Sequence, residues 1–147
     1  ETRMISHNLM PKTIKDFGYS LAVEQLINSL NEASDVQLSF FTNFREGRLS
    51  PILERNLYRI TQEAVTNIVK HSKAQSGVVQ LMKYPEMLIL TIEDDGTGFD
   101  PAAVDSKNHI GLRNIAIRSE TIGARLDIDS RPGNGTIIAL QIPLIHE

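Results

Sequence analysis

Two short runs of the chain contain residues whose types and spacing suit ligand binding. Glu63 and Asn67 lie in EAVTNIVKH, and Asp94 begins DDGTGFD, which also contains Gly96 and Gly98. Residues four apart share one face of a helix, so the first two side chains can act on one object. An asparagine oxygen suits Mg²⁺, and paired glycines let a backbone approach a ligand closely. Taken together, the runs indicate a nucleotide pocket.

Asp94 continues a row of apolar side chains in a candidate strand. Side chains alternate faces along a strand, so Leu88, Leu90 and Ile92 point the same way as Asp94, toward the interior. A desolvated carboxylate needs a committed donor, and the exocyclic amino group of adenine is a good one. Thr136 opens a second inward row, so its hydroxyl could share a base or an ordered water with Asp94. A β-branched residue at a strand start is the alternative for Thr136.

Both runs also have simpler interpretations. Glu63 and Asn67 could form a solvated helix edge, with Lys70 and His71 placed favourably near the negative end of the helix dipole. Asp94 could simply begin a turn. Two glycines after an inward acid favour the pocket over a turn.

A loop of about a dozen residues lies between Gly98 and Gly111, and loops of that length are often lids. It leads into a predicted helix, whose first N–H groups and positive dipole would suit phosphate oxygens. Arg113 and Asn114 lie close to that helix start. An ordinary surface charge is the alternative for Arg113.

The composition restricts the classes of protein that fit. The chain has 147 residues, of which 41% are hydrophobic, enough for one domain with a sizeable core. With a formal charge of -3, the chain lacks the excess of basic residues that is typical of a nucleic-acid binder. The absence of cysteine excludes disulfides and thiolate metal sites. We expect a cytoplasmic domain whose parent could be anchored in the inner membrane, because Glu1 enters a helical pattern with no capping signal.

The first half of the chain predicts mostly helix. Pro11 should interrupt a first helical segment, after which apolar residues resume a helical period as far as Asn31. Residues 36–43 are rich in β-formers. A long helix should follow, with Ser50 as N-cap and Pro51 as first residue, ending near His71. Apolar residues at spacings of three and four should form one stripe on this helix that faces the core: Leu53, Leu57, Ile60, Ala64 and Ile68.

The second half predicts strands around one further helix. Residues 77–84 and 87–94 should form an antiparallel hairpin, because only Pro85 and Glu86 separate them. A helix over residues 111–122 should end at Gly123. Residues 124–130 and 136–142 each place apolar side chains on one face. The expected fold is an α/β two-layer sandwich with a mixed, largely antiparallel sheet and helices on one face.

These motifs together resemble the ATP-binding catalytic domain of sensor histidine kinases, which belong to the Bergerat-fold (GHKL) ATPases. The run LYRITQEAVTNIVKHSKA is similar to the asparagine box, and EDDGTGFD to the first glycine box. The segment IGLRNIAIRSETIGARLDIDSRPGNGTIIALQIP is similar to the second glycine box with its trailing strands. The resemblance covers nearly the whole chain.

The resemblance implies ATP and Mg²⁺ as ligands, with a role for each matching residue. Glu63 would assist phosphoryl transfer, Asn67 would coordinate Mg²⁺, and Asp94 would bind the adenine amino group. The remaining ATP-binding residues would be Lys70 and His71 near the phosphates, Gly96, Gly98 and Gly111 at the lid, and Leu112 and Thr136. His109 departs from the pattern, because many relatives have glycine two residues before the equivalent of Gly111.

The N-terminal residues resemble the kinase subfamily whose response regulators are often of the NarL type. Residues 1–32 would be the end of the second helix of a dimerisation hairpin and a linker, and residues 33–147 the catalytic domain. His7 should not be the phosphorylated histidine, because about thirty residues are too few for the rest of a hairpin and a linker. The acceptor would lie upstream of Glu1, in a homodimeric parent that passes the phosphoryl group to a receiver domain.

Other functions of the same fold are alternatives. A conformational-switch ATPase fits less well, because little chain follows Ile142 and the lid is short. A nucleotide-binding regulatory module and an anti-sigma-type serine kinase stay open. The acid stability of a phosphorylated product separates them, since phosphohistidine is acid-labile and phosphoserine is not.

Overall fold

Five strands form one mixed sheet in the computed structural model, which describes residues 11–99 and 110–144. The strand order is β1-β2-β3-β5-β4; β1 pairs with β2 in parallel, and the other three pairs are antiparallel. In chain order the elements are α2 (Lys12–Phe17), α3 (Tyr19–Ala33), β1 (Gln37–Thr42), α4 (Pro51–His71), β2 (Ser76–Lys83), β3 (Met87–Asp94), α5 (Ile110–Thr121), β4 (Arg125–Ser130) and β5 (Thr136–Pro143).

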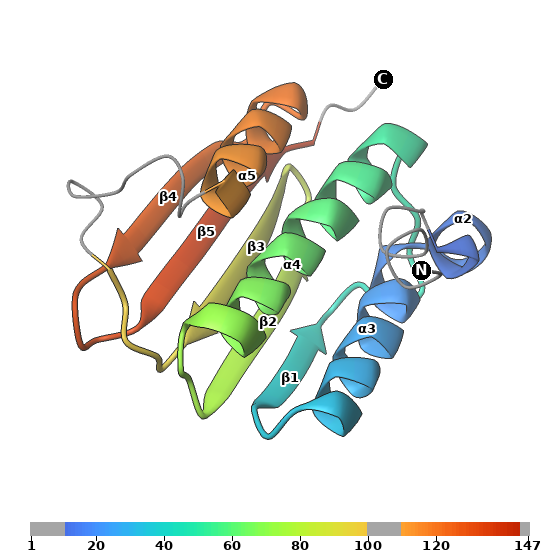
Figure 1. Cartoon of the computed structure of the whole chain (residues 1–147). Helices are drawn as coiled ribbons and strands as arrows, with labels where there is room; N and C mark the ends of the chain where they lie inside the picture. Colours follow the sequence, from blue (N-terminus) through green and yellow to red (C-terminus); the bar gives the residue numbers. More distant parts are fainter. Residues whose placement is uncertain (1–10, 100–109, 145–147) are drawn as a thin grey trace.

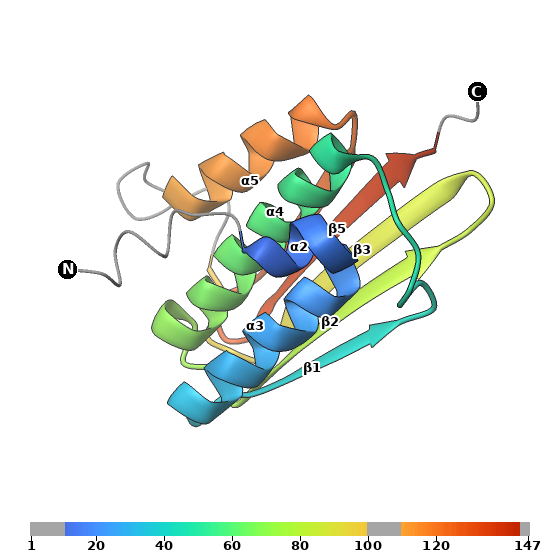
Figure 2. The ribbon, with the colours of Figure 1, turned by 90° about the vertical axis from the view of Figure 1, so that its right-hand side faces the viewer.

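The helices cover one face of the sheet, with α4 between α3 and α5 (Figures 1 and 2). The opposite face carries exposed polar side chains, among them Gln80, Glu93 and Gln141. The predicted two-layer sandwich with a mixed, largely antiparallel sheet is therefore confirmed. No helix in the described part of the chain is long and apolar enough to cross a membrane.

Local signals placed α4 and the hairpin correctly. Ser50 caps α4, because its side chain accepts a hydrogen bond from the Leu53 N–H at 3.3 Å, and Pro51 is the first helical residue. The strands β2 and β3 pair antiparallel as expected. At the end of α5, Gly123 has a φ of 68° and donates its N–H to the Glu120 carbonyl at 3.0 Å, which confirms the predicted stop.

The core lies between α4 and the inner face of the sheet. The predicted stripe of α4 packs there: Leu57, Ile60, Ala64 and Ile68 are almost completely buried, and Leu53 is partly buried. They meet an equally buried layer from the strands, which includes Val79, Leu81, Leu88, Leu90, Leu140 and Ile142. Each fully buried Leu or Ile contributes about 1.5–3 kcal/mol. This layer fixes α4, and with it the polar edge that carries Glu63 and Asn67.

A break at Gly18 divides the N-terminal helical region in a way the sequence did not reveal. Gly18 has a φ of 96°, a conformation that favours glycine, and it separates α2 from α3. A Cβ added there would lie 3.0 Å from the Arg48 side chain and 3.1 Å from Glu54 Oε2. Because Arg48 and Glu54 come from a later part of the chain, local periodicity contained no sign of this break.

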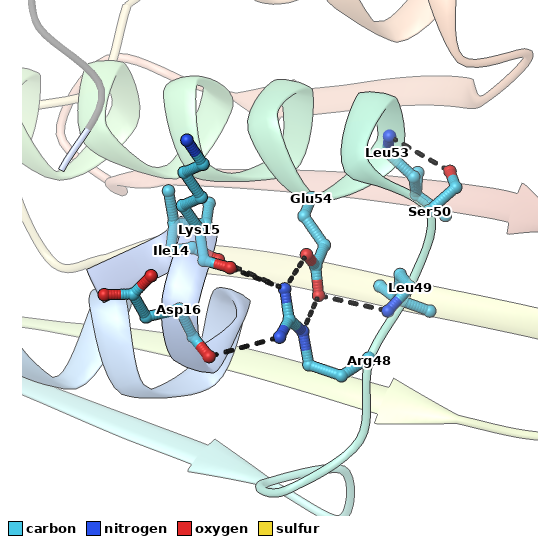
Figure 3. A network of polar contacts seen from close by, with 8 residues as sticks. All are labelled: Ile14, Lys15, Asp16, Arg48, Leu49, Ser50, Leu53 and Glu54. Carbon is cyan, nitrogen blue, oxygen red and sulfur yellow. Dashed lines mark hydrogen bonds and ion pairs between the residues drawn. The ribbon is translucent and has the colours of Figure 1, made fainter. Parts of the chain in front are cut away.

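Arg48 joins α2 to the start of α4 (Figure 3). Its guanidinium donates to both carboxylate oxygens of Glu54 at 3.0 Å, and Glu54 also accepts the Leu49 N–H at 3.0 Å. The same guanidinium donates to the carbonyls of Lys15 at 3.1 Å and Asp16 at 3.3 Å, in the last turn of α2. Those carbonyls lack partners within the helix. We call this network the Arg48 clamp.

Candidate nucleotide-binding site

A cavity of about 620 Å³ lies beside α4, the first turn of α5 and the adjoining ends of β3 and β5. Its apolar walls include Ile68, Ile92 and Ile138. Most of the predicted site residues line it: Glu63, Asn67, His71, Asp94, Gly98, Gly111, Leu112 and Thr136. Segments that lie far apart in the chain are thus brought to one cavity, as the nucleotide-pocket interpretation required.

Two predicted residues do not line this cavity. Lys70 is exposed, and Gly96 is buried behind the cavity wall, where an added Cβ would lie 2.3 Å from the Ser72 carbonyl oxygen. The Thr97 N–H donates to that carbonyl at 2.7 Å, so Gly96 allows the glycine-rich loop to pack against the end of α4. Residues 100–109 of the predicted lid, which include His109, and His7 lie outside the described residues.

The polar edge of α4 lies directly under the start of α5. A Cβ added to Gly111 would lie 2.7 Å from Asn67 Nδ2 and 3.0 Å from Glu63 Oε2. Only a residue without a side chain allows the two helices to come this close at that point. Glu63 and Asn67 are half-buried, and both line the cavity. A plain solvated helix edge therefore does not describe them.

Asp94 lines the same cavity from the inner face of β3. It faces Thr136 on the neighbouring strand β5 in the register of the sheet. Asp94 Oδ1 accepts the Gly96 N–H at 2.8 Å. Burial raises the pKa of the Asp94 carboxyl; the Gly96 hydrogen bond opposes this shift, and the charges of Asp95 and Glu93 add to it. A carboxylate in this position gains from a further hydrogen-bond donor.

Ser130 supports the site through Thr136, and the sequence analysis missed it. It ends β4, is buried, and its hydroxyl contacts Thr136 Oγ1 at 2.8 Å. A signal was present, because Ser130 follows Leu126 and Ile128 in the inward alternation of its strand. A polar residue at the end of an inward row is the same feature that identified Asp94.

Position 98 requires glycine for two reasons, its backbone conformation and the lack of space for a side chain. Its φ is 64°, and an added Cβ would lie 2.0 Å from the Arg131 carbonyl oxygen. We expect Gly98→Ala to lower the free energy of unfolding by about 3 kcal/mol, because the backbone must move as well as adopt a strained φ. Gly123→Ala is the matched control: its φ is 68° with nothing within 4 Å, so only about 1 kcal/mol should be lost. Urea denaturation measures both; equal losses would contradict the role of the Arg131 contact.

The family of the chain follows from comparison with known proteins. A family model described as "Histidine kinase-, DNA gyrase B-, and HSP90-like ATPase" matches residues 52–146, a range that holds every element around the cavity. The chain belongs to this ATPase family. The matched residues are accordingly an ATP-binding domain, which agrees with a cavity that combines apolar walls, an inward carboxylate and a helix start.

Relatives with similar sequences are sensor proteins. An "uncharacterized sensor-like histidine kinase" of Chloroflexus aurantiacus is 35% identical over 98% of this chain and 25% of its own length. The sensor protein VraS of Staphylococcus saprophyticus is 34% identical over 100% of this chain and 42% of its own length. The chain thus spans less than half the length of these relatives.

Solved structures share the fold of this ATPase domain. The histidine kinase domain of the blue-light activated histidine kinase from Erythrobacter litoralis EL346 matches with a TM-score of 0.67 and 24% identity, over 86% of this chain and 61% of that one. The histidine kinase AdeS of Acinetobacter baumannii matches with a TM-score of 0.68 and 13% identity, over 85% and 62%. At these identities the similarity shows the fold.

Proposed function

We propose that this chain is the ATP-binding catalytic domain of a two-component sensor histidine kinase, which transfers the γ-phosphoryl group of ATP to a histidine upstream of Glu1. One observation carries the proposal: a single cavity joins the inward carboxylate of Asp94 to the Glu63 and Asn67 edge of α4. An adenine amino group at the first and phosphates at the second would fill such a cavity. The name of the Chloroflexus aurantiacus relative, a sensor-like histidine kinase, supports the same reaction.

The base and the phosphates of ATP would bind in different parts of the cavity. The base would lie against Ile92 and Ile138, with its amino group at Asp94 and Thr136. The phosphates would lie toward the first turn of α5, at Gly111 and Leu112, because the first N–H groups of a helix and its dipole favour anions. Lys70 and His71 are exposed at the end of α4, and His71 lines the cavity. Both would offer hydrogen-bond donors to the nucleotide. Gly96 and Gly98 shape the loop that closes the base end.

Mg²⁺ suits the polar edge of α4. Within the described residues no group of three or more His, Cys, Asp or Glu side chains could enclose a metal ion. Mg²⁺ needs no such cage, because it keeps several waters and is held by one or two protein oxygens together with phosphates. Asn67 Oδ1 would be the protein ligand, and the bound ion would neutralise charge on the phosphates. Glu63, one helical turn away, would orient or deprotonate the accepting group.

We propose that, in the parent, residues 1–32 form the end of the second helix of a dimerisation hairpin and a linker. Residues 33–147 would form the catalytic domain. Within the first segment, α3 packs into the same core as the sheet through Val23 and Ile27. Asn31 also bonds the backbone of Leu38 in β1, at 2.8 and 2.9 Å. A linker docked in this way would couple the position of the hairpin directly to that of the ATP-binding sheet.

The remaining partners follow from the proposed reaction. The parent would be a homodimer, its hairpin would present the histidine, and the receiver domain of a response regulator would take the phosphoryl group. Nucleic acid is not expected as a partner, because the chain has a formal charge of -3. The domain would function in the cytoplasm, in a parent that could be tethered to the inner membrane by segments outside this chain.

Asn67→Ala tests the proposal. With the chain, Mg²⁺-ATP and a separately supplied hairpin that carries the histidine, we expect the rate of phosphoryl transfer to fall by about 100-fold, since an interaction with the transferring group is removed. The free energy of unfolding should change by less than about 0.5 kcal/mol, because Asn67 is half-buried at a helix edge. The wild-type product should be acid-labile, as phosphohistidine is.

Asn56→Ala is the matched control. Asn56 lies on the same side of α4, near Arg118 of α5, and does not line the cavity. This variant should transfer phosphate at the wild-type rate. Unchanged transfer and unchanged Mg²⁺-ATP binding in Asn67→Ala would refute the metal assignment, and an acid-stable product would refute the histidine kinase itself.

A further inference from the structure

Ser130 contacts three groups at the base end of the cavity. Its hydroxyl oxygen lies 2.9 Å from the Phe99 N, 3.1 Å from the Gly135 carbonyl oxygen and 2.8 Å from Thr136 Oγ1. Ser130 is only 6% exposed, so water does not substitute freely for these partners. Phe99 belongs to the glycine-rich loop, Gly135 to the turn before β5, and Thr136 to β5 itself. One buried hydroxyl therefore ties together three segments beside the cavity.

The number of hydrogens decides the direction of each bond. A serine hydroxyl has one hydrogen and two lone pairs. The Phe99 N–H can only donate, and the Gly135 carbonyl can only accept, so Ser130 receives from Phe99 and donates to Gly135. The contact with Thr136 is then satisfied only when Thr136 donates to Ser130. This arrangement satisfies all three contacts. It also means that Thr136 Oγ1 can only accept, and cannot donate, a hydrogen bond on the side of the cavity.

Asp94 presents acceptors beside Thr136. The two residues are directly opposite in the β3–β5 register, where side chains on one face come within about 5 Å of each other. The Gly96 N–H occupies Asp94 Oδ1, and Oδ2 is the other acceptor of the carboxylate. Thr136 and Asp94 both line the cavity. Two neighbouring strands thus offer hydrogen-bond acceptors at the same end, and the hydroxyl hydrogen of Thr136 is turned away.

We propose that Ser130 is a positioning residue for base selection: it makes the Thr136 hydroxyl an acceptor, so that Thr136 and Asp94 together receive the two hydrogens of one exocyclic amino group. The inference rests on the proposed binding of ATP and names the part of the base that is read. A carbonyl oxygen in the same place would face two acceptors and no donor. Such a site discriminates against the wrong group because buried polar atoms are left unpaired.

ATP and inosine triphosphate (ITP) provide the test, because a carbonyl oxygen in ITP replaces the amino group of adenine. Binding of each nucleotide to the chain is measured by calorimetry. We expect the wild-type chain to prefer ATP by about 100-fold. In Ser130→Ala the Thr136 hydroxyl is free to rotate and donate to a carbonyl, so the preference should fall by about tenfold. Ser130→Thr keeps a hydroxyl at this position and should restore the preference.

A second pair of variants tests the same idea without changing Ser130. Thr136→Val removes the acceptor and should lower the preference by about tenfold, whereas Thr136→Ser should keep it. Equal loss of ATP and ITP affinity in Ser130→Ala, with an unchanged ratio in Thr136→Val, would show that Ser130 is structural only and overturn the proposal. So would a wild-type chain that binds ATP and ITP equally well, although ATP binding itself would stand. A wild-type chain that binds neither nucleotide overturns the proposed function as well.

Discussion

Replacing Asp94 by asparagine should weaken ATP binding by about 100-fold or more while leaving the fold intact. The Gly96 N–H donates to Asp94 Oδ1, so the single oxygen of the asparagine would be held at Gly96. Its amide nitrogen would then take the place of Oδ2 and present hydrogens to the adenine amino group. A donor facing a donor, in place of a charged hydrogen bond, costs about 3 kcal/mol of binding. Calorimetry of ATP binding measures the loss.

The stability of the Asp94→Asn variant should not fall. Burial raises the pKa of Asp94, so the ionised carboxylate is less favourable in the folded protein than in the unfolded chain. Removing that charge should leave the free energy of unfolding at neutral pH unchanged or slightly higher. Asp129→Asn, on the exposed face of β4, is the control for the general loss of one negative charge and should keep wild-type ATP affinity.

The pH dependence of ATP binding gives a second measure of Asp94. Because the pKa of Asp94 is raised in the folded protein, the free protein protonates this group at a higher pH than an ordinary aspartate. ATP affinity should therefore decline as the pH falls through the raised pKa, since a protonated carboxyl has lost part of its acceptor capacity. Asp94→Asn should lack this decline. An identical pH profile in both proteins would be incompatible with Asp94 as the adenine anchor.

The sequence predicted those features that depend on neighbouring residues. Helical spacing identified the apolar stripe of α4, and strand alternation turned both Asp94 and Thr136 inward. Alternation does not determine which strands are neighbours. That β5 inserts between β3 and β4, and so places Thr136 opposite Asp94, depends on pairing across about forty residues of chain.

The features that were missed depend on contacts between distant segments. Gly18 separates two helices with a positive φ, and Arg48 and Glu54 occupy the space that a side chain there would need. Gly96 and Gly111 were expected to shape a lid, yet each also allows close packing against α4, at Ser72 and at Asn67. A glycine in a sequence signals freedom or proximity, but the neighbouring atom is known only once the tertiary structure is available.

The Arg48 clamp should contribute to stability through Glu54, and its removal should leave the ATP site intact. Glu54 is 3% exposed and accepts hydrogen bonds only from Arg48 and Leu49 among the described contacts (Figure 3). We expect Glu54→Gln to lower the free energy of unfolding by about 2 kcal/mol, because charge-assisted bonds become neutral ones. Arg48→Met should destabilise the chain more, since it leaves the buried carboxylate without its cation. Urea denaturation measures each variant.

The double variant decides whether the clamp acts as one unit. Arg48→Met with Glu54→Met removes both charges together, so it should be more stable than Arg48→Met alone. The exposed pair of Arg45 and Glu24 is the control: Arg45→Met should cost no more than about 0.5 kcal/mol. Additive losses at Arg48 and Glu54 would show that the two act independently. ATP affinity, measured where each variant is folded, should stay at the wild-type value, because the clamp holds the first turn of α4 and the cavity begins at Glu63, more than two turns further along.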